Sequence, residues 1–152
     1  MRARLFWTGA TAVALMTALA GCADEPLPPE ELEAINLGAN AEAGPVSVDN
    51  LLVVTRDAGE PARLIGVLLN ESDASVDVTL SDADDSVSLS LDPGQQYALH
   101  ENPQIFDTAD EIPGATTEVT VAVDDDDTTM TVPVRDGTMA WLEPYLPADD
   151  AS

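Results

Sequence analysis

Residues 118–134, EVTVAVDDDDTTMTVPV, contain two runs in which apolar and polar side chains alternate one by one. Such alternation is typical of β-strands with one face on a core and the other in water, because successive side chains of a strand point to opposite faces. The four acids between the runs, Asp124, Asp125, Asp126 and Asp127, predict a solvated turn. This stretch therefore indicates a β-hairpin.

The same two-residue period recurs on the N-terminal side of this hairpin. Residues 64–69 are apolar on both faces, which predicts a central strand covered on both sides. Clusters of Gly, Pro, Asn and Asp separate the runs and supply turns. Seven strands are expected, at 46–54, 64–69, 76–80, 87–91, 97–99, 119–123 and 130–134.

Seven strands at spacings of about 8–12 residues predict an all-β fold, an immunoglobulin-like antiparallel β-sandwich over residues 46–147. The chain lacks the Cys–Trp–Cys signature of antibody domains, so cupredoxin-like sandwiches stay open as alternatives. Residues 100–116 break the rhythm and predict a long crossover loop with one helical turn. Residues 139–147 carry Trp141 and Tyr145 and are expected to dock on the body, whereas residues 148–152 are expected to fray.

The composition excludes several classes of function. The 152 residues include 29 acids, five arginines and no lysine, for a formal charge of −24. Nucleic acid is excluded as a partner, because its phosphates require Lys and Arg. Self-repulsion of this size favours a soluble monomer. A single cysteine excludes an intrachain disulfide framework and a Cys-cluster zinc site.

The N-terminus differs from the rest of the chain. Arg2 and Arg4 precede an apolar stretch at 5–18, which has the length of a signal-peptide core and is too short to span about 30 Å of hydrocarbon. Small residues and the lone cysteine follow it, as Leu19, Ala20, Gly21 and Cys22.

This order of charge, apolar run and Leu-Ala-Gly-Cys resembles the signal and lipobox of bacterial lipoproteins. The resemblance implies cleavage before Cys22 and attachment of diacylglycerol and a fatty acid (palmitate) to it, with no other cofactor. The mature chain would then be held in the bilayer of the cell membrane, on the extracytoplasmic face. Residues 22–45 hold four prolines and six acids and are expected to form a disordered spacer.

The body is similar to actinobacterial surface lipoproteins that combine an acidic spacer with a β-sandwich. The matching features are residues 46–54, 62–70, Pro113-Gly114 before a strand, and 132–134. Some of those proteins resemble copper chaperones of the PCuAC kind, which bind Cu(I) through a set of His and Met. Here the donors outside the signal are His100, Met130 and Met139, without a His-x-Met pair.

No residue pattern indicates catalysis. His100 is the only imidazole, no Gly-x-Ser-x-Gly elbow is present, and no lysine can act as a base or form a Schiff base. Carboxylates prefer hard cations such as Ca²⁺, so Asp124 to Asp127 and the turn at 82–85 are candidates for weak Ca²⁺ binding.

The sequence therefore predicts a membrane-anchored, extracytoplasmic, non-enzymatic binding module whose partner is a protein or a cell-wall component. Two alternatives remain: a copper chaperone-like protein that uses His100, Met130 and Met139, and a weak Ca²⁺-binding surface module.

Overall fold

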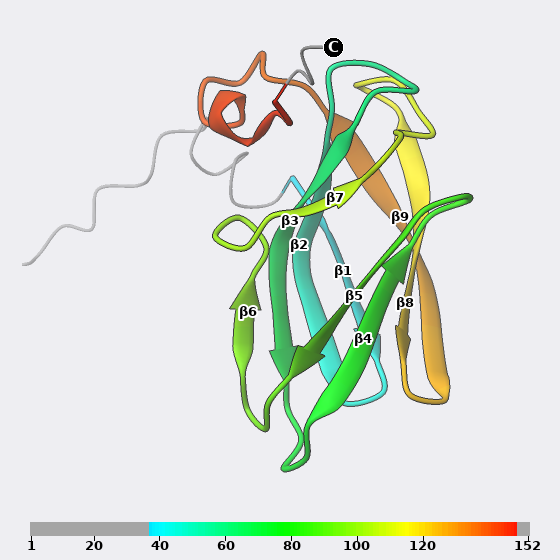
Figure 1. Cartoon of the computed structure of the whole chain (residues 1–152), viewed down its shortest axis with the longest axis vertical. Helices are drawn as coiled ribbons and strands as arrows, with labels where there is room; N and C mark the ends of the chain where they lie inside the picture. Colours follow the sequence, from blue (N-terminus) through cyan, green and yellow to red (C-terminus); the bar gives the residue numbers. More distant parts are fainter. Residues whose placement is uncertain (1–36, 149–152) are drawn as a thin grey trace, which may run out of the picture.

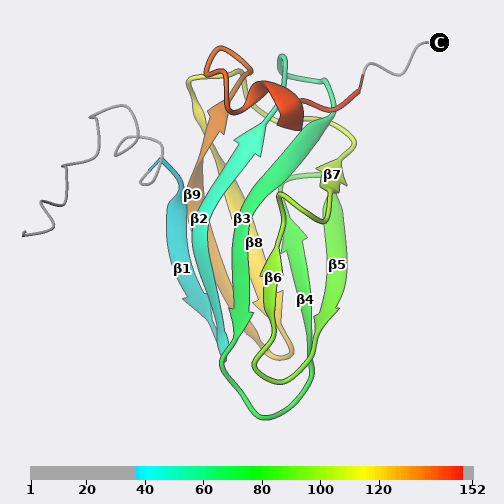
Figure 2. The same cartoon turned by 90° about the vertical axis from the view of Figure 1, so that its left-hand side faces the viewer.

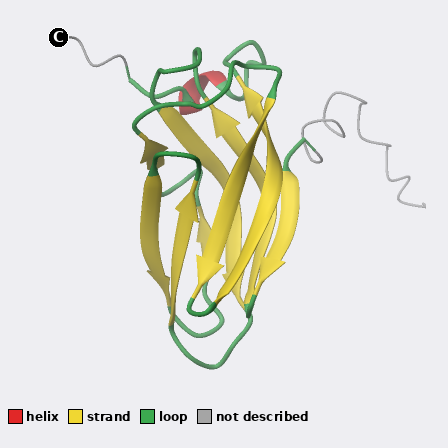
Figure 3. Ribbon diagram, turned by 90° about the vertical axis from the view of Figure 1, so that its right-hand side faces the viewer, coloured by secondary structure: helices red, strands yellow, loops and turns green. Residues whose placement is uncertain are grey.

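The computed structural model describes residues 37–148, and all of their regular structure is strand except for one short 3₁₀ helix near the C-terminus (Figures 1 and 3). The predicted signal, Cys22 and residues 149–152 lie outside the described residues. The elements are β1 (Ala39–Ala43), β2 (Val46–Val54), β3 (Ala62–Asn70), β4 (Val76–Ser81), β5 (Ser86–Leu91), β6 (Gln96–Ala98), β7 (Gln104–Phe106), β8 (Thr116–Val123), β9 (Asp126–Arg135) and η1 (Glu143–Tyr145). The predicted all-β sandwich is confirmed.

Two layers face each other across the core. One layer contains β1, β2 and β3, with β6 and β7 both paired to β3 (Figure 2). The other has the order β5-β4-β8-β9, with every neighbouring pair antiparallel. A short parallel pairing of β2 with β9, Val53 with Val134 and Val54 with Arg135, joins the layers into one nearly closed sheet. The all-antiparallel expectation is thus wrong at this one seam, where two strands from different hairpins meet.

The alternating residues form the core as their period predicts. The inward positions of the predicted 118–134 hairpin are all buried, and Val119, Val121, Val123, Val132 and Val134 have essentially no exposed surface. They pack with Leu64 and Leu68 of β3 and with the buried residues of β4 in one continuous cluster. Burial of each such side chain contributes about 1.5–3 kcal/mol, so this cluster is the main source of stability.

The central strand β3 is covered on both faces, as its continuous apolar run predicts. Leu64 and Leu68 face the inter-layer core. Ile65 faces outward and joins Leu52, Val54 and Leu142 in a second buried cluster. Leu142 comes from the segment after β9, which lies across the ends of β2 and β3 (Figure 2). The expected docking of the C-terminal segment is therefore confirmed.

Two expectations about segment boundaries need correction. The spacer was expected to reach residue 45, but β1 (Ala39–Ala43) pairs with β2 and buries Ala43. Its apolar positions are alanines, whose small side chains leave little periodic signal. Residues 100–116 contain no helical turn. They contain the three-residue strand β7, which pairs with β3.

No helix among residues 37–148 has the length and apolarity needed to cross a bilayer.

Candidate functional site

His100 lies at the surface, in the turn between β6 and β7. Its side chain is 40% exposed, and its Nε2 atom lies 3.9 Å from Glu101 Oε1. The turn is fixed from its backbone, since the carbonyl oxygen of His100 accepts a hydrogen bond of 2.8 Å from Arg63 Nη2. The Arg63 guanidinium in turn lies over the Tyr145 ring, 5.1 Å from its centroid. The imidazole is therefore accessible on a turn that β3 and η1 hold in place.

The two methionines are in different environments. Met130 is only 7% exposed, and it lies in the inter-layer core on β9, opposite Val119 of β8. Met139 is 36% exposed and belongs to the segment that follows β9. Two strands, β2 and β3, separate β9 from β6, which leads into the His100 turn. The structure thus places Met130 inside the sandwich and the other two donors on its surface.

The aspartate run at 124–127 forms the exposed end of the β8–β9 hairpin. Val123 pairs with Asp126, which leaves Asp124 and Asp125 as a two-residue turn. Asp124 adopts a positive φ of 53°, a conformation that aspartate tolerates better than most residues. The predicted turn is confirmed, and all four side chains are exposed to solvent.

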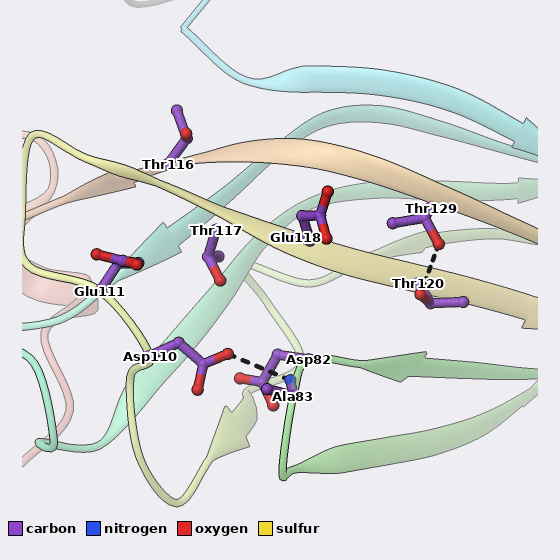
Figure 4. Close-up of a pocket in the computed structure, with 9 residues that line it drawn as sticks. All are labelled: Asp82, Ala83, Asp110, Glu111, Thr116, Thr117, Glu118, Thr120 and Thr129. Atoms are coloured by element: carbon purple, nitrogen blue, oxygen red, sulfur yellow. Dashed lines mark hydrogen bonds between the residues drawn. The ribbon is translucent and has the colours of Figure 1, made fainter.

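Three carboxylates do converge elsewhere in the described part of the chain. Asp82 and Asp84 lie in the β4–β5 turn, and Asp110 lies in the loop between β7 and β8. One oxygen from each lies within 4.8 Å of the others. An open pocket of about 550 Å³ adjoins them (Figure 4), and its lining residues are Asp82, Ala83, Asp110, Glu111, Thr116, Thr117, Glu118, Thr120 and Thr129.

Burial, with a smaller contribution from the neighbouring acids, raises the proton affinity of one of these carboxylates. The pKa of Asp82 is raised above 3.8, first by burial and then by the negative charges of Asp110 and Asp85. The backbone N–H groups of Asp85 and Asp84 donate to Asp82 Oδ1 at 2.8 and 3.3 Å and partly oppose the rise. Asp82 therefore carries its negative charge at a cost in free energy.

Sequence reasoning identified the 82–85 turn but missed the contribution of Asp110. Asp110 comes from the crossover that was expected to be a loop, and nothing in its neighbouring residues distinguishes it from other surface acids. Its proximity to Asp82 follows from the path of the crossover from one layer to the other.

No protein-family model matches this sequence, and no curated protein matches it. Solved structures with the same fold exist. The copper-bound PCuAC domain from PmoF2 matches with a TM-score of 0.51 at 16% identity, over 64% of this chain and 98% of that domain. The apo PCuAC domain from PmoF1 matches with a TM-score of 0.52 at 12% identity, over 64% of this chain and 99% of that domain. At these identities the likeness establishes the fold, which is that of PCuAC domains.

Proposed function

We propose that this chain is a non-enzymatic, extracytoplasmic copper-handling protein with the PCuAC fold, which binds Cu(I) through His100. One observation carries the proposal: the sandwich corresponds to nearly the whole of solved PCuAC domains, one of them copper-bound. Cu(I) is a soft cation that imidazole and thioether groups bind well. The chain offers one exposed imidazole, at His100, and one exposed thioether, at Met139.

The three candidate donors differ in burial, and this difference separates possible copper ligands from a residue that can serve as a control. His100 and Met139 are exposed enough for a metal to reach them. Met130 packs in the core opposite Val119, and its thioether is an apolar filler there. We therefore assign copper binding to His100 and Met139 and exclude Met130 from the ligand set.

Competition with a chromogenic Cu(I) chelator tests this assignment on the full chain. Wild type should bind one Cu(I) per chain. His100→Ala should lose at least tenfold in affinity, Met139→Leu should lose less, and Met130→Leu should bind as wild type, because Met-to-Leu swaps are well tolerated in cores. Absence of stoichiometric binding, or unchanged binding in His100→Ala, would overturn the copper proposal. A non-enzymatic module with a protein or cell-wall partner would then be the remaining reading.

The proposal places the protein at the outer face of the cell membrane, held by lipid on Cys22. It is supported by the lipobox-like residues Leu19 to Cys22 and by the apolar run before them. Fourteen residues, 23–36, separate Cys22 from the first described residue, Leu37, and three of them are prolines. At about 3 Å per residue, a spacer of that length would span several tens of Å if it were fully extended.

A further inference from the structure

The guanidinium of Arg63 lies in an unusual environment for a cation in so acidic a chain. Its Nε atom is buried and, among the described residues, has no hydrogen-bond partner. Arg63 also forms no ion pair with any carboxylate of residues 37–148, although the chain has 29 acids. A buried donor without a partner costs free energy, so packing alone does not account for an arginine at this position.

The sheet register places Arg63 on the face that the C-terminal segment, residues 136–148, covers. Arg63 pairs with Val54 of β2 on one side and with Ile105 of β7 on the other. Directly paired residues of neighbouring strands share a face, and Val54 lies in the outer buried cluster with Leu142. The side chain of Arg63 therefore points outward from β3, toward the C-terminal segment.

The guanidinium connects this segment to the turn that carries His100. Its Nη2 atom donates a hydrogen bond of 2.8 Å to the carbonyl oxygen of His100. Its Cζ atom lies over the Tyr145 ring, 5.1 Å from the ring centroid. Tyr145 ends η1 and packs against the outer buried cluster. A guanidinium plane is attracted to the face of an aromatic ring, so one side chain of β3 holds both the His100 turn and the C-terminal segment.

The turn itself is fixed to the sandwich at its start. Leu99 donates a backbone bond of 2.9 Å to the carbonyl of Gly66 on β3. Two further backbone bonds, of 3.1 and 3.2 Å, run within residues 98–102 and close the turn on itself. The bond from Arg63 is the one that reaches His100 from β3. Without it, the turn beyond Leu99 would open locally more often.

The C-terminal segment also carries the second proposed copper ligand, Met139. Leu142 anchors the segment in the outer buried cluster. The backbone nitrogen of Leu142 donates to the carbonyl of Met139 at 2.8 Å, so the backbone of Met139 is tied to the anchored part. Docking of the segment therefore fixes Met139 directly and the His100 turn through Arg63.

We propose that Arg63 is a positioning residue of the copper site, which couples the His100 turn to the C-terminal segment, so that docking of this segment sets the affinity for Cu(I). The inference rests on the proposed function, since it concerns the same two ligands. Arg63 does not bind the metal and acts through the backbone of His100. When the segment is released, both ligands lose their fixed positions and copper dissociates more readily.

Hydrogen exchange of the metal-free full chain, followed by NMR, tests the positioning role without copper. Arg63→Leu removes the guanidinium, and Tyr145→Leu removes the ring while it keeps an apolar side chain. Both should speed severalfold the exchange of the Glu101 and Asn102 amide protons, which donate to the carbonyl of Ala98 within the turn. Tyr145→Phe keeps the ring over Arg63 and should exchange as wild type does.

Competition with a Cu(I) chelator measures the effect on the site. Arg63→Leu and Tyr145→Leu should each lose about fivefold or more in Cu(I) affinity, the lower end of the coupling between linked sites. Tyr145→Phe and Arg135→Leu should bind as wild type. Arg135 is the matched control for loss of charge, because it also pairs with Val54 while its Nη1 atom donates to the carbonyl of Val134. Circular dichroism melts show that each variant is folded at the temperature of measurement.

Three results would overturn the inference: unchanged exchange in Arg63→Leu, unchanged Cu(I) affinity in Arg63→Leu despite faster exchange, or equal losses of affinity in Tyr145→Phe and Tyr145→Leu. Failure of the proposed function is distinguishable from these. In that case wild type binds no stoichiometric Cu(I) while the turn still loosens in Arg63→Leu, and the copper role of Arg63 is overturned together with the function.

Discussion

At the scale of single residues, Asp82 shows how a turn can be ordered and electrostatically unfavourable at once. Its carboxylate accepts two backbone bonds that fix the β4–β5 turn. Burial and two neighbouring acids nevertheless raise its pKa. A group whose pKa is higher in the folded chain than in the unfolded one contributes stability below the unfolded value near 3.8, and this contribution is lost as the pH rises through the folded value. At neutral pH the charge on Asp82 therefore opposes folding.

Asp82→Asn should accordingly raise the melting temperature at pH 7, since the amide oxygen can still accept both backbone bonds. The gain should shrink toward zero as the pH falls below about 3.8, where wild-type Asp82 is protonated as well. Thermal melts of both proteins in EDTA at pH 7 and pH 3 measure the difference. Asp125→Asn serves as the comparison for loss of charge alone and should gain less. A lower melting temperature for Asp82→Asn at pH 7 would contradict this electrostatic account.

The burial and the hydrogen bonds of Asn70 could not be predicted from the sequence. The sequence places it in a polar turn cluster, where such side chains are usually solvated. In the structure it is fully buried, and its amide nitrogen donates to the carbonyls of Ala74, Leu91 and Asp92 at 2.7, 3.3 and 3.0 Å. Its Oδ1 accepts from the nitrogen and the hydroxyl of Ser72. These bonds tie the β3–β4 loop to the end of β5, a contact that depends on chain path and leaves no trace in local sequence.

At the scale of elements, the segment after β9 makes a second layer on the sandwich. Leu142 is fully buried against Leu52, Val54 and Ile65, while its neighbour Trp141 is 37% exposed. This cluster is what covers the outer face of β2 and β3. The apolar run at 64–69 predicted such cover, and the aromatic residues near the C-terminus predicted a docked segment. The anchor, however, is Leu142 and not Trp141, because the short turns after Met139 direct Leu142 inward.

Leu142→Ala should cost about 2–5 kcal/mol of unfolding free energy, the range for truncating a buried leucine and leaving a cavity. Urea unfolding followed by circular dichroism measures the loss. Trp141→Ala is the neighbouring control and should cost less, since much of that side chain is already in water. A Leu142→Ala variant within 0.5 kcal/mol of wild type, which is about the spread of neutral surface substitutions, would show that the segment is not held through this residue.

Strands were predictable where their apolar residues are large and alternate strictly. The 118–134 hairpin satisfies this rule, and β2 does so despite the register shift between Asp49 and Leu52, where Asn50 has a φ of 54°. The rule fails for β1, whose inward positions are alanines, and for β7, which has three residues. β1 and β7 each pair with backbone groups of a longer strand, β2 and β3 respectively. Whether they form therefore depends on that partner strand and not on their own side chains.

At the scale of the whole molecule, the net charge would act against the proposed lipid anchor. Cleavage before Cys22 removes Arg2 and Arg4 and no acid, so the formal charge becomes more negative by two, from −24 to −26. Such a body is repelled by the anionic headgroups that attract polybasic proteins. Attachment to a bilayer must therefore come from buried acyl chains, at about 0.8 kcal/mol per methylene, and one chain alone binds only marginally. The proposed diacylglyceryl group on Cys22 supplies two.

Cys22→Ser should therefore move the protein from the membrane fraction to the soluble fraction of its native host, without changing the melting temperature of the sandwich. Wild type should stay with the membrane through a high-salt wash and leave it only in detergent, because salt screens charge but does not expose acyl chains to water. Mass spectrometry of the wild-type protein should find a chain that begins at Cys22 and carries the acyl mass. A serine variant that sediments with the membrane as firmly as wild type, or a wild-type chain that still begins at Met1, would contradict the anchor and leave the copper proposal to its own test.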